Sequence, residues 1–220
     1  MFMQIPNQAP VMTLAGTTLF PGTLAPLYIF EPRYRQMLAE VLHGDRMFVV
    51  AMQKPERLRE SPSEVAGLGL VRLCLANTDG TAHLILQGLC RVALTRTVQA
   101  KPFRVCQLRA LQTPARDSVA IDALMAKVRD LVSERVGLGF PISQLKPPPL
   151  KAKKEIISYL DKMDDPDQVA DIVSSALLAG AMERQIILET VEIEPRLKHL
   201  IHFLMAEIRL HRQQSAHEEH

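Results

Sequence analysis

Few side chains in this sequence have the types and the spacing that chemistry requires. Ser143 and Lys146 match the Ser-x-x-Lys spacing of a nucleophilic serine and its lysine, but the companion Ser-Asp-Asn and Lys-Thr-Gly motifs are missing. His199 and His202 lie three residues apart, as metal ligands on a helix can, yet no cysteine or pair of carboxylates nearby in the sequence completes a ligand set. We therefore predict neither a nucleophile nor a metal centre at these positions.

Three charged segments also have simple structural explanations. The lysines of residues 151–154 could contact phosphates, but no aromatic residue is interleaved with them, which favours a solvent-exposed helix start. The aspartates of residues 164–167 lack the glycine and the spacing of a calcium-binding loop, and they suit the N-terminus of a helix. The terminal residues 217–220 would bind a divalent ion only weakly, because a chain end is poorly preorganised. None of the three segments is assigned a function.

Glu31 and Arg33 are the remaining chemical pair. They could be a catalytic acid and its tuning partner, or an ion pair that holds a strand-to-helix corner. We favour the ion pair, because no third polar partner lies within reach in the sequence. No glycine precedes a lysine anywhere, so the Gly-x-x-x-x-Gly-Lys phosphate loop is absent. We predict a protein without catalytic residues, metal or cofactor.

The composition is that of a folded protein without a dominant charge. Hydrophobic residues make up 47% of the 220 residues, and the formal net charge is only +2 although 23% of the residues are charged. Sizeable cores are therefore expected, without a global field that would attract nucleic acid or anionic lipid. No apolar run approaches the roughly 20 residues that span a bilayer, and the first residues lack a signal-peptide pattern, so we expect a cytoplasmic protein. Cys74, Cys90 and Cys106 are expected to be free thiols.

The first half of the chain alternates short apolar runs with turn residues, which predicts a unit built mainly of strands. The predicted elements are strands over residues 11–14, 24–30, 47–52, 67–76, 81–87, 89–97 and 103–111, and a helix over 32–42. The helix is expected to end at Gly44 in a conformation with positive φ. The sequence Asn77-Thr78-Asp79-Gly80 predicts a tight hairpin. Stretches such as 71–75 are apolar on both faces, which favours a small closed barrel over an open sheet.

After Pro114 the apolar period changes from two to three or four, which predicts helices. We therefore divide the chain into residues 1–112 and 113–220. Asp117 is expected to cap the first helix, and Asp165 is expected to cap a later helix that begins at Pro166. The predicted helices cover 117–137, about 151–163, 166–177, 181–190 after a break at Gly180, and a final segment from Pro195. The predicted fold class is α+β, with a mainly antiparallel β-barrel followed by an α-helical bundle.

Two stretches are similar to the N-terminal domain of Lon proteases. Residues 19–34 match a Phe-Pro-x and Ile-Phe-Glu-x-Arg-Tyr pattern of that family, and residues 167–197 match its Ala-Asp, Gln-x-x-Leu-Glu and Arg-Leu pattern. The Asp-Gly-Thr hairpin and residues 88–91 lie between them in family order, so the resemblance covers about residues 13–210. The signature residues, for which we predict structural roles, are Phe30, Glu31, Arg33, Tyr34, Gly88, Arg91, Gln185, Glu189 and Arg196. We expect the last three to form a clamp between helices.

The resemblance implies a PUA-like β-barrel, an α-helical subdomain and a role in engaging protein substrates or partners. We predict a non-catalytic module that binds unfolded polypeptide or a protein partner, with an adaptor role in proteolysis as one form of this function. Candidate binding residues at the ends of elements are Phe20, Leu24 and Phe140. The alternative is an RNA-binding PUA-like protein, against which the 5% aromatic content and the absence of tryptophan argue. A hydrolase whose active-site residues come together only in the folded protein is a further alternative, and self-association into a homo-oligomer is also left open.

Overall fold

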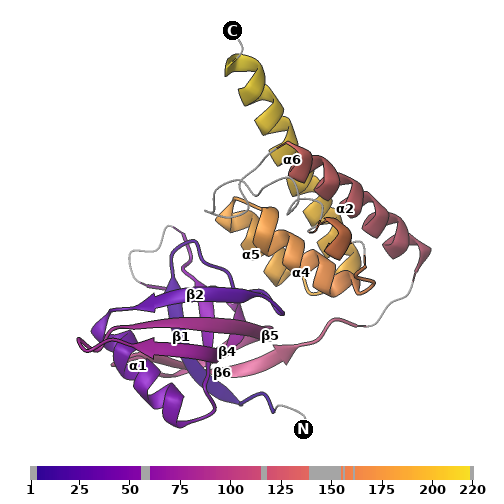
Figure 1. Cartoon of the computed structure of the whole chain (residues 1–220). Coiled ribbons are helices and arrows are strands. Elements are labelled where there is room, and N and C mark those ends of the chain that lie inside the picture. Colours follow the sequence, from indigo (N-terminus) through magenta and orange to yellow (C-terminus); the bar gives the residue numbers. More distant parts are fainter. Residues whose placement is uncertain are drawn as a thin grey trace. The chain divides into compact units, whose positions relative to one another are not determined.

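The computed structural model describes residues 4–55, 60–114, 118–138, 155, 157–160 and 162–218. The chain divides into two compact units, Met1–Gln112 and Thr113–His220. The first unit contains all the strands and one helix, and the second contains the other helices (Figure 1). The predicted mixture of a strand-rich half and a helical half is therefore confirmed.

The first unit is built around one six-stranded sheet. Its elements in chain order are β1 (Gln8–Leu14), β2 (Leu24–Ile29), α1 (Pro32–His43), β3 (Met47–Met52), β4 (Val65–Ala76), β5 (Ala82–Gln99) and β6 (Arg104–Leu111). Hydrogen bonds connect the strands in the order β2-β5-β4-β3-β1-β6, and β6 also pairs with β5. All strands except β2 therefore form a closed circuit, and β2 is attached outside it to β5. Every pairing is antiparallel except that of β1 with β3.

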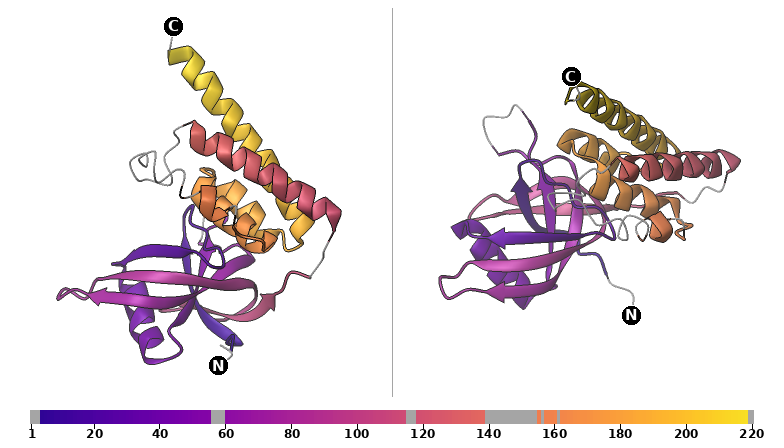
Figure 2. Two further views of the ribbon diagram at one scale, coloured as in Figure 1. Left: turned by 45° about the vertical axis from the view of Figure 1, so that its right-hand side comes forward. Right: turned by 45° about the horizontal axis from the view of Figure 1, so that its top comes forward.

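The core of this unit lies on both faces of the central strands. All six residues of β3 are buried, since alternate side chains enter two different apolar clusters. One cluster includes α1 and contains Tyr34, Met37, Phe48, Val50 and Leu86 among others. The other contains Val49, Leu68, Val92 and Cys106 among others. Figure 2 shows α1, in purple, against the strands in both views.

The sequence interpretation was wrong where it divided β5 into two strands. The strand runs unbroken through Gly88 because that glycine is a point of close approach rather than a turn. A Cβ atom at Gly88 would lie 2.0 Å from the main-chain oxygen of Phe20, and one at Gly67 would lie 2.1 Å from that of Leu19. The segment that contains Leu19 and Phe20 therefore crosses β4 and β5 at distances that only glycine permits.

The predicted hairpin between β4 and β5 is confirmed. Gly80 has φ +80°, its amide donates to the Asn77 oxygen over 3.1 Å, and the Asn77 amide donates to the Thr81 oxygen over 2.8 Å. The Asp79 carboxylate accepts bonds from the Thr81 hydroxyl (2.7 Å) and amide (2.9 Å), and these bonds lower the pKa of Asp79. The turn is thus held by its own side chains.

The predicted end of α1 was wrong in one detail. Gly44 follows the helix but has φ −107°, and the positive φ of 59° belongs to Arg46. The Arg46 amide donates to the Val41 oxygen (3.1 Å), and its guanidinium donates to the Val71 oxygen of β4 (3.3 Å). These bonds hold a non-glycine residue in the left-handed region.

The second unit contains α2 (Val119–Gly137), α4 (Pro166–Leu177), α5 (Ala181–Glu189) and α6 (Ile193–Glu218). Ser118 caps α2 by accepting a hydrogen bond from the Ile121 amide (3.3 Å), whereas the predicted cap, Asp117, lies outside the described residues. The predicted cap of α4 is confirmed, because the Asp165 carboxylate accepts from the Asp167 amide over 3.0 Å and Pro166 is the first helical residue. The break before α5 occurs at Gly180 as predicted.

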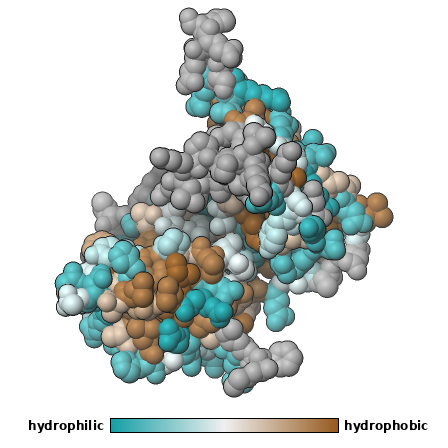
Figure 3. Space-filling view, viewed as in Figure 1, coloured by the Kyte–Doolittle hydropathy of each residue, from teal (hydrophilic) through white to brown (hydrophobic). Residues whose placement is uncertain are grey.

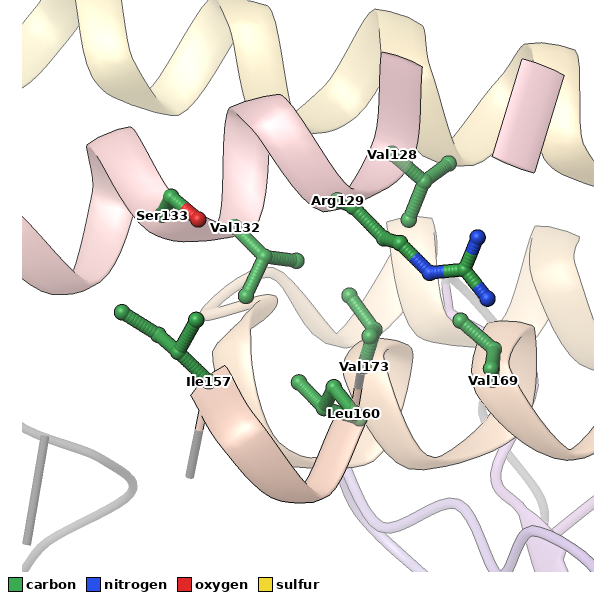
Figure 4. A pocket seen from close by; sticks show the side chains of 8 residues that line it. All are labelled: Val128, Arg129, Val132, Ser133, Ile157, Leu160, Val169 and Val173. Atoms are coloured by element: carbon green, nitrogen blue, oxygen red, sulfur yellow. The ribbon is translucent and has the colours of Figure 1, made fainter. Parts of the chain in front are cut away.

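The helices pack through valine and leucine side chains. Figure 4 shows a hollow between α2, α4 and the short stretch of residues 157–160. The side chains of Val128, Val132, Leu160, Val169 and Val173 point into this hollow and leave no room for a water molecule. The hollow is therefore part of the core of the second unit rather than a ligand pocket.

Candidate functional site

Exposed apolar side chains gather on the outer face of β2, β5 and β4. The register places Tyr28, His83 and Leu75 in one row across the three strands, and Pro26, Ile85 and Leu73 in the next. We call this surface the strand face and define it by Leu24, Pro26, Tyr28, Leu73, Leu75, His83 and Ile85. Figure 3 shows apolar residues gathered on this side of the first unit, around the place where Figure 1 draws β2 and β5.

The strand face encloses an open hollow of about 340 Å³. Leu73 is 48% exposed and Leu75, two residues further along β4, is 58% exposed, which is unusual for neighbouring leucines on a folded domain. The Tyr28 ring stacks on the His83 ring with 4.6 Å between centroids, and on the Phe30 ring with 5.8 Å. The aromatic side chains are thus held against one another and still present apolar area to solvent.

The local sequence explains why β2 contributes apolar side chains to the strand face. Alternate residues of a strand point to opposite faces, so Leu24, Pro26 and Tyr28 point outward while Leu27 and Ile29 point toward the core. This alternation of outward and inward apolar residues is visible in the sequence.

The contribution of β4 depends on an irregularity that the sequence did not reveal. The register of β4 on β5 shifts between Val71 and Leu73, so the extra residue Arg72 reverses the alternation. Val71 is buried, but Leu73 and Leu75 face solvent. Residues 71–75 were predicted to be apolar on both faces, and the bulge leaves the face that carries Leu73 and Leu75 exposed.

The predicted binding residues have three different outcomes. Leu24 lies on the strand face. Phe20 is 0% exposed, so its assignment to a binding surface was wrong: the close crossing over Gly67 and Gly88 buries its side chain in the core. Phe140 lies outside the described residues.

The corner after β2 holds the predicted ion pair and one partner that the sequence analysis missed. The Arg33 Nε donates to the Glu31 carboxylate over 2.9 Å, and Arg33 Nη1 also bonds the carboxylate of Glu60. The Arg33 guanidinium lies 4.4 Å from the centre of the Tyr34 ring. The Tyr34 hydroxyl donates to the Thr13 oxygen and accepts from the Thr13 amide, both over 3.1 Å, and burial raises the pKa of this phenol. These contacts hold the corner in place.

Arg196, one of the signature residues, is the centre of a clamp that links α6 to α4 in the second unit. Arg196 at the start of α6 is fully buried, and its Nη1 donates to the Asp167 carboxylate of α4 over 2.6 Å and lies 3.8 Å from that of Asp171. Its Nε donates to the Thr190 oxygen over 2.7 Å. The carboxylates that reach Arg196 come from α4, whereas Glu189 accepts a bond from Gln185 within α5 over 2.8 Å.

The remaining candidates for chemistry that lie among the described residues do not assemble into a centre. His199 and His202 are exposed and contact the Phe203 ring, and His199 Nδ1 lies 3.2 Å from the Thr190 hydroxyl. Across the described ranges, no group of His, Cys, Asp and Glu side chains could hold a metal ion. Ser143, Lys146 and residues 151–154 lie outside those ranges. No helix within the described part of the chain is both long and apolar enough to cross a membrane.

Comparison with known proteins identifies the family. The family model described as the ATP-dependent protease La (LON) substrate-binding domain matches residues 8–206. The chain belongs to this family. The Lon protease of Trichlorobacter lovleyi is 27% identical over 192 residues, which are 85% of this chain and 22% of that protein. The Lon protease of Dictyoglomus thermophilum is 22% identical over 209 residues, which are 94% of this chain and 25% of that protein. The chain thus spans about a quarter of the length of these Lon protease relatives.

Solved structures of Lon N-terminal domains share the fold. The N-terminal domain of a Mycobacterium avium complex Lon protease has a TM-score of 0.71 at 18% identity, over 90% of this chain and 98% of that domain. The Lon N-terminal domain protein from Xanthomonas campestris has a TM-score of 0.63 at 16% identity, over 89% of this chain and 98% of that protein. The match to the substrate-binding domain family covers neither an ATPase nor a protease domain.

Proposed function

We propose that this protein is a non-catalytic module that holds unfolded polypeptide segments on the strand face. The observation that carries the proposal is the strand face itself, where leucine, proline and tyrosine side chains of β2 and β4 remain exposed on either side of the half-buried Ile85 of β5. Unfolded polypeptides expose apolar side chains that folded proteins bury, so such a surface favours them as ligands. The family supports the proposal through its description as a substrate-binding domain.

In this proposal the hollow receives side chains of the bound segment. A volume of about 340 Å³ is at the lower end of the range of ligand pockets, which suits a few apolar side chains better than a folded partner. Burial of apolar area is non-directional, so many sequences can bind with similar affinity. A module that delivers substrates must accept many sequences.

The finer architecture and the cellular role belong to the same proposal. The closed circuit of strands supports a PUA-like β-barrel, and the helices of the second unit support a helical bundle subdomain. We propose an adaptor role in proteolysis, in which the protein presents bound segments to a protease. The cytoplasmic location and self-association stay predictions.

The test is capture of a reduced and carboxymethylated polypeptide, which cannot fold, compared with its native form. We expect the wild-type protein to bind the unfolded form only, and Leu73→Gln to weaken that binding without changing the melting temperature. Equal binding of native and unfolded forms, or full binding by Leu73→Gln, would contradict the proposal.

The same assay separates this function from RNA binding. The residues that define the strand face include neither lysine nor arginine, so binding there should change little between low and high salt. Binding to phosphates would weaken steeply as salt rises. Salt-sensitive capture of oligouridine without capture of the unfolded polypeptide would favour the RNA-binding alternative.

A further inference from the structure

The outer edge of β2 is a second place where a polypeptide could bind, next to the strand face. Among the described residues, no strand pairs with this edge. An open strand edge presents N–H and C=O groups, and an extended chain can add to it as a further strand. Such an addition would bring the new strand directly beside the strand face.

The hydrogen-bond pattern of β2 shows which residues face the open edge. The Gly88 amide donates to the Thr23 oxygen over 2.9 Å, so the Thr23 carbonyl points toward β5, whereas the Thr23 amide donates to the Phe20 oxygen. Alternate residues of a strand point their main-chain groups in opposite directions, and the ladder from β2 to β5 has no register shift. The main-chain groups of Leu24, Pro26 and Tyr28 therefore face the open edge.

Pro26 is the middle residue of these three, and a proline has no N–H to donate. Strand addition would lose its central hydrogen bond from β2 at this position. The same residue contributes an apolar ring to the strand face between Leu24 and Tyr28. Pro26 thus adds apolar area and removes a main-chain donor.

We infer that Pro26 prevents extended polypeptide from pairing with β2, so that the site selects its ligands through their side chains alone. This inference rests on the proposed function. The ligand class is then any segment with bulky apolar side chains, including segments whose own N–H groups are missing because they contain proline. Pro26 also protects an exposed apolar edge strand from pairing with a second copy of the chain.

The experiment compares wild type, Pro26→Val and Leu24→Val. Valine is a good strand former and restores the missing N–H at position 26, whereas Leu24→Val changes an outward side chain of the same strand without adding a donor. The probes are a synthetic peptide of about ten residues, in which leucine alternates with threonine between terminal lysines, and two versions N-methylated at every second residue in either phase. Fluorescence anisotropy measures the affinities, and sedimentation velocity measures self-association.

For wild type, and separately for Leu24→Val, we expect the affinities of the one protein for the three peptides to lie within about twofold of one another, whatever affinity Leu24→Val loses as a whole. We expect Pro26→Val to bind the unmethylated peptide about two- to tenfold more tightly than wild type, as one net hydrogen bond allows, and to discriminate against one methylated phase. Loss of wild-type binding on methylation would overturn the inference, as would a Pro26→Val protein that treats the three peptides alike.

Failure of the proposed function gives a different result. If wild type binds none of the peptides, the strand face does not capture apolar segments, and sedimentation then decides the inference about Pro26. We expect Pro26→Val to self-associate more strongly with rising concentration than wild type or Leu24→Val. Identical sedimentation of the three proteins would overturn the inference in that case.

Discussion

Replacement of Leu75 by glutamine tests the strand face most directly. Leu75 lies in the row with His83 and Tyr28, and its side chain is held in place by β4 but exposed on its outer side. Glutamine has a similar size and keeps the strand intact, but it presents an amide in place of two methyl groups. The substitution therefore removes apolar area from the binding surface with little change in shape.

The expected loss follows from the exposed fraction of this side chain. Complete burial of a leucine side chain is worth about 1.5–3 kcal/mol. Leu75 is 58% exposed, so a ligand can bury at most that share, which corresponds to roughly 0.9–1.7 kcal/mol. The dissociation constant should rise about fourfold to twentyfold. Because the side chain is exposed, the free energy of unfolding should change by no more than about 0.5 kcal/mol.

The assay is fluorescence anisotropy of a labelled, carboxymethylated polypeptide, with urea unfolding of each variant as the stability control. Leu210→Gln is a matched control, because Leu210 on α6 is 57% exposed and lies outside the strand face. We expect Leu210→Gln to bind like wild type. An unchanged dissociation constant for Leu75→Gln, or an equal loss in both variants, would refute the assignment of the site.

Three further predictions concern the supporting structure. Arg196→Met should lower the free energy of unfolding by about 3–5 kcal/mol, because it leaves the buried carboxylate of Asp171 without its cation. Lys198→Met, which breaks the exposed ion pair with Glu194, should lower it by less than about 0.5 kcal/mol. Urea unfolding compares the two, and equal losses would contradict the clamp. Gly88→Ala should lower the free energy of unfolding, followed in thermal melts, by about 1–3 kcal/mol, because its Cβ would lie 2.0 Å from the main-chain oxygen of Phe20. Gly137→Ala is the control: its Cβ would lie in open space, so this substitution should be neutral or stabilising. Burial raises the pKa of Tyr34, so the neutral phenol should stabilise the fold below about pH 10, and this contribution should decline above that pH. Tyr34→Phe should therefore lose less stability than wild type as the pH rises above about 10. An identical decline in the two proteins would contradict this prediction.

Local features of the fold could be predicted because they depend on neighbours in the sequence. The bounds of β3, the hairpin at Gly80 and the cap formed by Asp165 and Pro166 each follow from contacts within a few residues. The family signature also identified Arg196 as a structural residue. What it did not reveal was the partner, because Asp167 lies 29 residues earlier in the chain.

The candidate site was only partly predictable. Leu24 could be chosen because it begins a strand, but Leu73 and Leu75 face solvent only because Arg72 forms a bulge against β5. A bulge depends on how two strands align, and the sequence of one strand does not specify it. Phe20 was misassigned for a related reason, since its burial depends on glycines that are distant in sequence.

The sequence by itself determined the family, the division into a strand-rich and a helical half, and local features such as the hairpin at Gly80 and the cap of α4. These local features depend on residues that are close together in the sequence. The tertiary structure decided which apolar side chains are buried and which remain exposed. Strand register, bulges and close crossings set that division, and each of them requires two distant segments to meet. The strand face exists because three strands align their outward apolar residues and, within the described part of the first unit, nothing pairs with the outer edge of β2.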